Sequence, residues 1–440
     1  MTDAVPRARL RLDPARIARG RRVSGRRRGL LVGLLLFVVY AAGIGLHAQP
    51  GSDLRAAEAH ILLTTESIVH DGDAELTNQY RQRSWRDLRP GTLVPTALAV
   101  DGRLSEPHGL VFPALLAPAY AVGGRLGVEL FLALIAAIGF AIAAALARRL
   151  VPDPWASGTA LAVGLSPPAV IGATTIAPVM TCATLIAAAA LLALRVRDNP
   201  LHGPAVGCAL LLAPVIWLSG PATIPAAVVA VMLVRWLGRR RRTWTGIAAT
   251  EILLMSVIIY VTVNDRLHDG LTAYASSVLP HTPTGAADIG DYAERLTRLW
   301  RLLVTPPGGI LLYAPVLILC AGSIGLLWRS RRDRLARTFP QEADIEVSAG
   351  LLAAVCLAAF ITAVLLIPAT GARWPGETLA VALPCAAGLA AWAMRRWVRV
   401  GVALALVGVV LTAWILIAAR VDDGAGLAPV RGSIPWAMLR

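Results

Sequence analysis

The chain has 440 residues, of which 56% are hydrophobic, with a mean hydropathy of +0.64 and a formal net charge of +15. Apolar stretches of about 20 residues recur along it, which excludes an ordinary soluble domain and indicates an all-α polytopic membrane protein. All 42 basic residues are arginines, clustered between the apolar stretches. The positive charge therefore does not indicate a nucleic-acid partner.

The apolar stretches predict about eleven transmembrane helices within a single transmembrane domain over 30–419. In chain order they are Leu30–Leu46, Gly127–Ala147, Ala156–Ile171, Val179–Leu194, Ala205–Leu218, Ile224–Leu237, Gly246–Val263, Gly309–Trp328, Val347–Ile367, Thr378–Met394 and Gly401–Ala419.

The arginine clusters predict the orientation. Ten arginines precede the first span, and further clusters lie at Arg239–Arg242 and Arg329–Arg337. Arginine-rich connections remain on the cytoplasmic side, so we expect the N-terminus inside, the C-terminus outside and a location in the plasma (inner) membrane. The expected regions outside the spans are a basic cytoplasmic tail (1–29), two long external loops (47–125 and 264–307) and an external tail (420–440).

The first external loop is the most polar part of the chain. It contains a predicted helix over Leu54–His70 and a short apolar piece, Gly109–Val122, which has two prolines and is too short to span a bilayer. If this piece crossed the membrane, Arg148 and Arg149 would lie outside. We therefore expect an interfacial or re-entrant helix with surface helices around it.

Glu58 is the candidate general base in this loop. Its neighbours one helical turn away are aliphatic: Leu54, Ile61 and Leu62. A carboxylate among aliphatic side chains is partly desolvated, which raises its pKa and makes it a better base. Asp53 and His60 lie in the same segment. The alternative is that Glu58 complements the dipole of the first helical turn.

An acidic turn follows this helix. Gly72 fits a helix stop, and Asp71, Asp73 and Glu75 surround it. With Glu58 these acids could bind a divalent cation, or they could form a solvated turn. The chain has neither the spacing of a calcium loop nor that of a zinc site, so no metal ligand is assigned; no cofactor is indicated apart from this divalent cation.

Two further groups of residues could contact substrate. Glu106 and His108 precede the short apolar piece and could contact a sugar, or form a plain turn. In the second loop, an amphipathic helix is predicted, with three arginines on one face and leucines on the other. The candidate phosphate ligands are Arg295, Arg298, Arg301 and, in the third external loop, Arg373. The alternative partner of these arginines is anionic lipid.

Four stretches carry a resemblance to a known family. They are EAHILL (Glu58–Leu63), DGDAELTNQY (Asp71–Tyr80), EPHGLVFPALLAPAY (Glu106–Tyr120) and PPGGILLYAP (Pro306–Pro315). With the long first loop, they resemble the GT-C integral-membrane glycosyltransferases, in particular the branch of protein mannosyltransferases and aminoarabinose transferases.

The resemblance implies a transferase that moves a sugar from a polyprenyl-phosphate donor to a glycan, lipid or protein acceptor of the cell envelope. It implies Glu58 as the base and an active site on the extracytoplasmic face. The residues assigned to substrate binding are Asp53, His60, Asp71, Asp73, Glu106 and His108, and the four arginines named above are assigned to the donor phosphate.

Two alternatives remain open. One is a lipid-binding or transport protein, which predicts internal repeats and ionisable residues at mid-membrane; neither is evident, because the spans are nearly free of charge apart from Glu251 at the start of the seventh span. The other is a non-catalytic GT-C-like scaffold, which only a measurement of activity or ligand binding separates from the transferase. The chain has no P-loop and no dinucleotide-binding glycine pattern.

Overall fold

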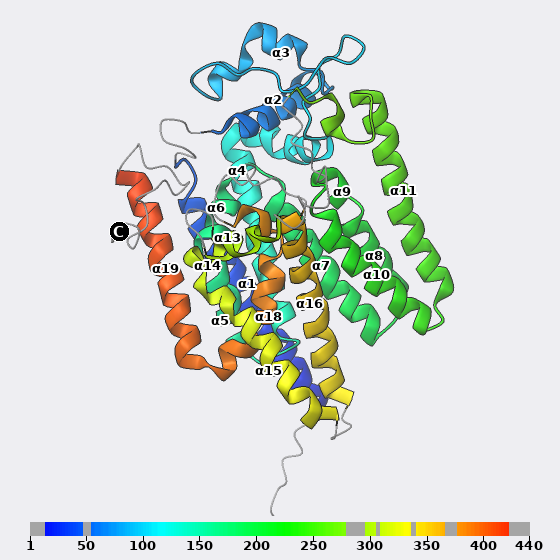
Figure 1. Ribbon diagram of the computed structural model, residues 1–440, viewed down its shortest axis with the longest axis vertical. Helices are drawn as coiled ribbons and strands as arrows, with labels where there is room; N and C mark the ends of the chain where they lie inside the picture. Colours follow the sequence, from blue (N-terminus) through cyan, green and yellow to red (C-terminus); the bar gives the residue numbers. More distant parts are fainter. Residues whose placement is uncertain are drawn as a thin grey trace, which may run out of the picture.

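The computed structural model describes residues 14–46, 54–278, 295–304, 309–335, 340–365 and 376–421 (Figure 1). Within these residues the secondary structure is helical, and the only extended pairing consists of isolated bridges. The prediction of an all-α fold is confirmed. Asp53, Arg373 and the tail beyond Val421 lie outside the described residues.

The longer helices form an elongated bundle. In chain order they are α1 (Pro14–Ala42), α2 (Ala56–His70), α4 (Val111–Ala147), α5 (Trp155–Gly164), α6 (Pro167–Thr174), α7 (Val179–Asp198), α8 (His202–Leu212), α10 (Thr223–Arg239), α11 (Thr243–His268), α15 (Ile318–Leu335), α16 (Pro340–Leu365), α18 (Leu383–Arg396) and α19 (Val398–Val421).

Short helices connect the longer ones. They are α3 (Thr77–Gln82), η1 (Ser84–Asp87), α9 (Val215–Leu218), η2 (Ala273–Ser276), α13 (Arg298–Val304), α14 (Ile310–Tyr313), η3 (Pro315–Leu317) and α17 (Glu377–Ala380).

Each of the eleven predicted spans falls on a helix or on consecutive helices separated by a short break. By length and composition, five helices of the described chain could cross a membrane, or six if the bent pair α5 and α6 forms one span. The apolar helices at 202–218 and 315–329 are shorter than a full span. The polytopic character is therefore confirmed, whereas the number of crossings stays a prediction.

At two places the helices differ from the predicted segments. The span predicted over Ala156–Ile171 is two helices that meet at 62°, because Ser166 is extended and Pro167 starts a new helix. Helix α1 begins at Pro14, so it includes part of the stretch that was assigned to the basic tail.

The centre of the bundle is rich in small residues. Helix α18 is buried along almost its whole length and packs against α4, α5, α15 and α16. Gly388 shows why small residues are needed here: a Cβ at this position would lie 3.1 Å from the Leu352 side chain. Close approach through alanine and glycine is a common way to pack helices within a membrane.

Helix α4 is broken in the middle. Gly123 and Gly124 have non-helical backbone angles, and Gly124 has a φ of 55°, which glycine adopts without strain. The predicted short piece and the second predicted span are therefore two helical parts that change direction at these glycines (Figure 1). The break places Arg125 at the start of the second part.

One end of the bundle is covered by the first long loop. Helix α2, predicted over Leu54–His70, lies across this end and packs on α4 (Figure 1). The outer layer has its own small core, formed by Ala59, Leu63, Leu76, Trp85 and Leu93. Two faces of α2 are thus covered, one by the bundle and one by the loop that follows it.

Candidate active site

Glu58 lies in the first turn of α2 and its side chain is only 3% exposed. One carboxylate oxygen accepts the backbone N–H of Arg55, at 2.9 Å. The other accepts the backbone N–H of Ile176, at 3.3 Å, from the turn between α6 and α7. Two backbone N–H groups, one from the start of α2 and one from the turn between α6 and α7, therefore hold this carboxylate in place.

A small polar cavity lies beside this carboxylate. It is lined by residues from four parts of the chain: Gly43, Gly45, Leu46, Leu54, Arg55, Glu58, Arg125, Glu129, Thr174, Thr175 and Ile176. Arg125 donates to the buried Glu129 carboxylate at 2.8 Å, an i,i+4 pair on α4. The cavity therefore combines two carboxylates with two guanidinium groups, which suits both proton abstraction and the binding of an anion.

A second, mostly apolar cavity begins at the next residue of the same turn. It is lined by Ala177, Pro178, Val179, Ser219, Pro221, Ala222, Ala359, Thr362, Glu377 and Val381. Because Ile176 bonds to Glu58 and Ala177 lines this second space, the turn between α6 and α7 separates a polar cavity from an apolar one.

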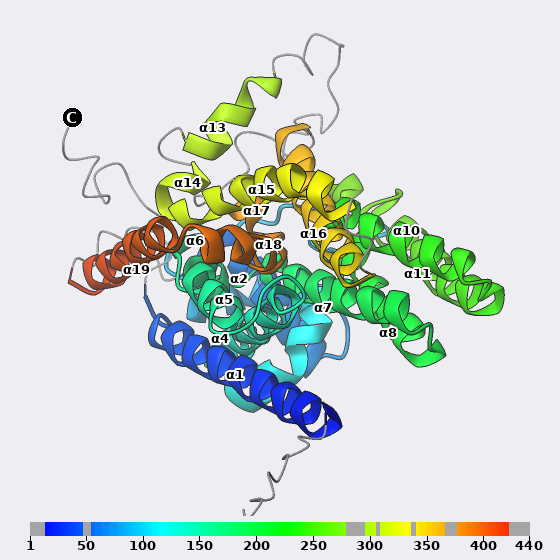
Figure 2. The ribbon, with the colours of Figure 1, turned by 90° about the horizontal axis from the view of Figure 1, so that it is seen from below.

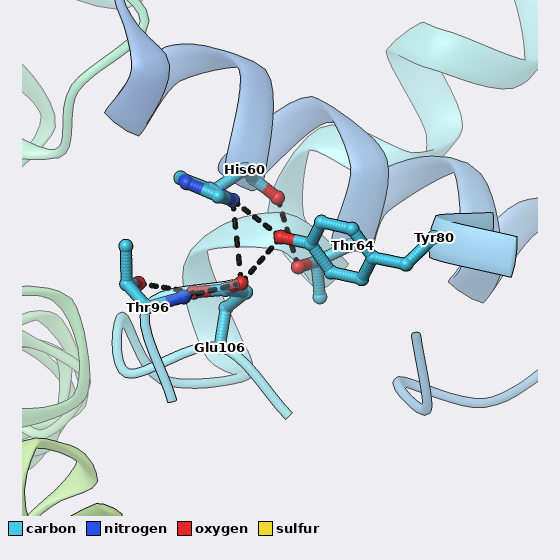
Figure 3. A network of polar contacts seen from close by, with 5 residues as sticks. All are labelled: His60, Thr64, Tyr80, Thr96 and Glu106. Carbon is cyan, nitrogen blue, oxygen red and sulfur yellow. Dashed lines mark hydrogen bonds and ion pairs between the residues drawn. The ribbon is translucent and has the colours of Figure 1, made fainter. Parts of the chain in front are cut away.

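His60 lies on the other side of α2 from Glu58. Two residues of α-helix turn the side-chain direction by about 200°, so the two side chains cannot face the same space. Glu58 points to the turn between α6 and α7, on the bundle side. His60 points to the loop that covers α2 (Figure 3). The helix therefore separates the predicted base from the predicted substrate ligands His60, Glu106 and His108.

The His60 side of α2 holds a closed polar network (Figure 3). Tyr80 donates its hydroxyl proton to the buried Glu106 carboxylate and lies 2.7 Å from Nδ1 of His60. The backbone N–H and the hydroxyl of Thr96 also donate to Glu106. Burial, followed by the negative charge of Glu106, raises the pKa of Tyr80, so this hydroxyl keeps its proton.

This network fixes the tautomer of His60. Because the Tyr80 hydroxyl donates to Glu106, its oxygen is left to accept a hydrogen bond from His60. Nδ1 of His60 also lies 3.3 Å from the Glu106 carboxylate, which is an acceptor too. A proton on Nδ1 therefore satisfies both contacts.

The network also joins the two loops that were predicted to be external. Thr96 and Leu98, beside Glu106, pair with 276–278 in an antiparallel bridge. On the second loop, Ser276 is 2.9 Å from Nδ1 of His268. Glu106 therefore fixes the segment around Thr96, and this segment pairs with the second loop.

His108 is close to this network. Its ring centroid is 6.2 Å from that of His60, and its Nε2 atom is buried with no hydrogen-bond partner among the described residues. Burial lowers the pKa of His108 to about 4, and the neighbouring Glu106 charge opposes part of this effect. His108 is therefore neutral at physiological pH.

The acidic turn lies at the far end of α2. Asp71 accepts hydrogen bonds from Asn78 and Gln79, and Asp73 accepts them from Ser67 and the backbone of Glu75. Thirteen residues of helix separate Glu58 from Asp71, or about 20 Å. The idea that this turn and Glu58 share one divalent cation was therefore wrong. No cluster of three or more His, Cys, Asp or Glu among the described residues could hold a metal ion.

The structure does not bring the second-loop arginines to the Glu58 cavity. Arg298 and Arg301 lie on α13, and neither lines that cavity. Arg295 donates to the backbone carbonyl of Leu365, which lies one helical turn beyond Thr362 of the second cavity. The side chains that line the Glu58 cavity with cationic groups are instead Arg55 and Arg125, which the sequence reasoning did not assign.

A local signal for part of this site was present in the sequence. Arg125 and Glu129 form an i,i+4 pair directly after two consecutive glycines, a pattern that indicates a charged pair held at a helix break. No local signal connects this pair to Glu58, because their shared cavity depends on contacts between distant segments.

Comparison with known proteins supports the fold. No protein-family model and no curated protein matches the sequence. Among solved structures, ArnT from Cupriavidus metallidurans bound to undecaprenyl phosphate has a TM-score of 0.52 at 17% identity, over 93% of this chain and 74% of that chain. Its apo state gives a TM-score of 0.51 at 16% identity with the same coverage. The oligosaccharyltransferase of Archaeoglobus fulgidus shows a weaker similarity, with a TM-score of 0.47 at 13% identity, over 93% of this chain and 59% of that one.

The resemblance predicted from the four sequence stretches is therefore confirmed at the level of fold. Nearly the whole chain follows the architecture of ArnT, a GT-C glycosyltransferase, and the apolar helices are those of a multi-pass membrane protein. The chain has the fold of the GT-C membrane glycosyltransferases.

Proposed function

We propose that the chain is a membrane glycosyltransferase that moves a sugar from a polyprenyl-phosphate donor to an acceptor on the extracytoplasmic face. The observation that carries this proposal is the buried Glu58 carboxylate at a cavity that also contains Arg55 and Arg125. The fold shared with ArnT, which was solved with undecaprenyl phosphate bound, supports it.

In this proposal Glu58 is the general base. It takes the proton from an acceptor hydroxyl, the oxygen forms a bond to the anomeric carbon, and the bond from that carbon to the donor phosphate breaks. The leaving phosphate keeps the electron pair of that bond and gains negative charge, which a guanidinium group stabilises. Glu58 is proposed as the base because it lies in the stretch that carries the resemblance, whereas Glu129 lies outside that stretch and forms an ion pair with Arg125.

The second cavity suits the lipid part of the donor. Its lining is mostly alanine, valine and proline, and it lies across a single turn from the Glu58 cavity. Arg295 bonds to the end of α16, one turn from Thr362 in that lining. We infer that the prenyl chain enters from this side, with its phosphate near the α13 arginines or Arg125 and its sugar towards Glu58.

The arrangement of the helices supports the proposed orientation. The arginine-rich junctions α10–α11, α15–α16 and α18–α19 lie away from α2 (Figure 1). With these junctions on the cytoplasmic side, the Glu58 cavity faces the opposite side of the membrane. The acceptor would then reach the site from outside the cell, and the donor from within the bilayer.

The test is donor binding and sugar transfer by the purified protein in liposomes, with Glu58→Gln as the central variant. Glutamine keeps an acceptor for the Arg55 N–H, so the helix start is preserved while the base is lost. We expect transfer to fall by about 10²- to 10⁴-fold with polyprenyl-phosphate binding retained. Retained transfer in Glu58→Gln would refute the role of Glu58.

The non-catalytic scaffold gives a different pattern in the same experiment. It predicts that polyprenyl phosphate binds to the wild-type protein but that no sugar is transferred, with any of the donors offered. A protein that co-purifies with bulk lipid alone and does not bind polyprenyl phosphate would contradict both readings.

A further inference from the structure

Helix α11 is the least covered apolar helix among those long enough to cross a membrane. Only 6% of its most apolar stretch is buried, compared with 28% for α19, which is also an outer helix. It lies at one edge of the bundle against α8 and α10 (Figure 2). One whole side of α11 therefore faces away from the protein.

The inward side of α11 is fully used. Ser256 donates to the Ala213 carbonyl at 2.7 Å and accepts from Trp217 at 3.1 Å. Trp217 in turn packs edge-on against Tyr260, with ring centroids 5.3 Å apart. The polar groups on this side have partners within the chain, so this side needs no additional protein.

The outward side carries a carboxylate in an apolar row. Ile247, Glu251, Leu254 and Ile258 are spaced by four, three and four residues, and all four side chains are exposed. No hydrogen bond or ion pair from the described residues reaches the Glu251 carboxylate. Its neighbours one turn away on α11 are Ile247, Ala248, Leu254 and Met255, which cannot pair with it.

Glu251 lies about a third of the way along the apolar part of the helix. It is seven residues, or about 10 Å, from Trp244 and thirteen residues, or about 20 Å, from Asn264. The stretch from Trp244 to Asn264 is therefore about as long as the hydrocarbon core of a bilayer is thick, about 30 Å, so Glu251 lies within that core. Carboxylates at this depth are rare and almost always pair with another polar group, so the row predicts a partner.

The charges of α11 select the kind of partner. A second copy of this chain, related by a two-fold axis along the membrane normal, would place Glu251 against Glu251. It would also bring together two copies of the exposed Arg239–Arg242 cluster at the start of α11. Both contacts are repulsive, so the surface disfavours self-association.

We propose that the outward face of α11 (Ile247, Glu251, Leu254 and Ile258) binds a transmembrane helix of a second protein, which carries a basic side chain at the depth of Glu251. Acidic residues at the end of that helix would face Arg239–Arg242. The apolar row supplies the packing, and the buried charge pair sets register and orientation. This inference does not depend on the proposed transferase activity.

The test is site-specific photo-crosslinking in membranes of the native host. A photoreactive residue replaces Leu254 on the α11 face or, as a matched control, Val410 on α19, which is apolar and similarly exposed. We expect a discrete protein adduct from position 254 but not from position 410. Glu251→Leu should reduce the adduct by about tenfold.

A charge-swap experiment then tests whether Glu251 pairs with a basic residue of the captured protein. Replacing its intramembrane basic residue by Glu, or making Glu251→Arg here, should each abolish the adduct, and the two together should restore it. An adduct that consists of a second copy of this chain, one that persists in Glu251→Leu, or none at position 254 would each overturn the proposal. Glu251→Gln and Glu251→Leu are also checked for monodispersity after purification. A monodisperse variant that gives less adduct has lost the pairing, whereas an aggregated variant has misfolded.

Discussion

The two sides of α2 carry the same kinds of residue but have different surroundings. On one side, Glu58 reaches a cavity through which a ligand could approach it. On the other, Glu106 is enclosed by Tyr80, His60 and Thr96, which occupy its oxygens. Both carboxylates accept hydrogen bonds on each oxygen, and of the two Glu58 lines the cavity. We therefore propose that Glu58 takes part in catalysis and that Glu106 stabilises the fold.

Glu106→Gln should have the largest effect on stability. The amide loses the charge-assisted hydrogen bonds from Tyr80 and Thr96, which we expect to lower the free energy of unfolding by about 2–3 kcal/mol. Thermal unfolding in detergent measures this loss. A variant as stable as the wild type would show that Glu106 does not hold the loop, and would return it to the list of substrate ligands.

Tyr80→Phe should have a smaller effect on the same side of α2. The variant keeps the ring and removes one hydroxyl, which leaves a shared oxygen of Glu106 and Nδ1 of His60 without that partner. We expect a loss of about 1–2 kcal/mol in the same unfolding measurement. If Tyr80→Phe instead abolished transfer without a change in stability, the network would have a role in sugar transfer.

His108 should make stability fall in acid. In the folded protein the pKa of His108 is about 4, below the ordinary 6.5. The contribution of this neutral ring to the free energy of unfolding is therefore fully present above pH 6.5. That contribution is lost as the pH falls from 6.5 towards 4, and we expect about 2 kcal/mol to be lost at pH 5. Unfolding of wild type and His108→Gln across this range measures it. Parallel pH profiles of the two proteins would contradict the assignment.

Asp71→Asn should have the smallest effect. The exposed Asp71 carboxylate accepts hydrogen bonds from Asn78 and Gln79 of the following helix α3, and asparagine can accept one of them. We expect a change of about 0.5 kcal/mol or less and unaltered transfer. A large loss of transfer with normal stability would restore Asp71 as a substrate ligand.

The helical parts of this architecture could be predicted because they depend on local patterns. Helix α2 was placed within two residues, since its apolar spacing and the stop at Gly72 are both local signals. The break in α4 was also anticipated, from the short length of Gly109–Val122. The bend between α5 and α6 was missed, although the Pro167–Pro168 pair carries a signal for a new helix start.

The site was only partly predictable, because its contacts are long-range. Glu58 could be chosen from its own surroundings, but the Ile176 N–H that orients it is 118 residues away. The grouping of His60 with Glu58 ignored helical rotation, which the sequence alone was enough to apply. The pairing of Thr96 with 276–278 has no sequence signature, because bridges of so few residues lack a strand pattern.

The most direct test compares Glu58→Gln and Glu106→Gln in one preparation, with sugar transfer and thermal unfolding measured on both. We predict that Glu58→Gln loses transfer and unfolds like the wild type. We predict that Glu106→Gln unfolds at a lower temperature and retains transfer for each folded molecule. The reverse pattern, with transfer lost in a stable Glu106→Gln and kept in Glu58→Gln, would contradict the assignment of the two sides of α2.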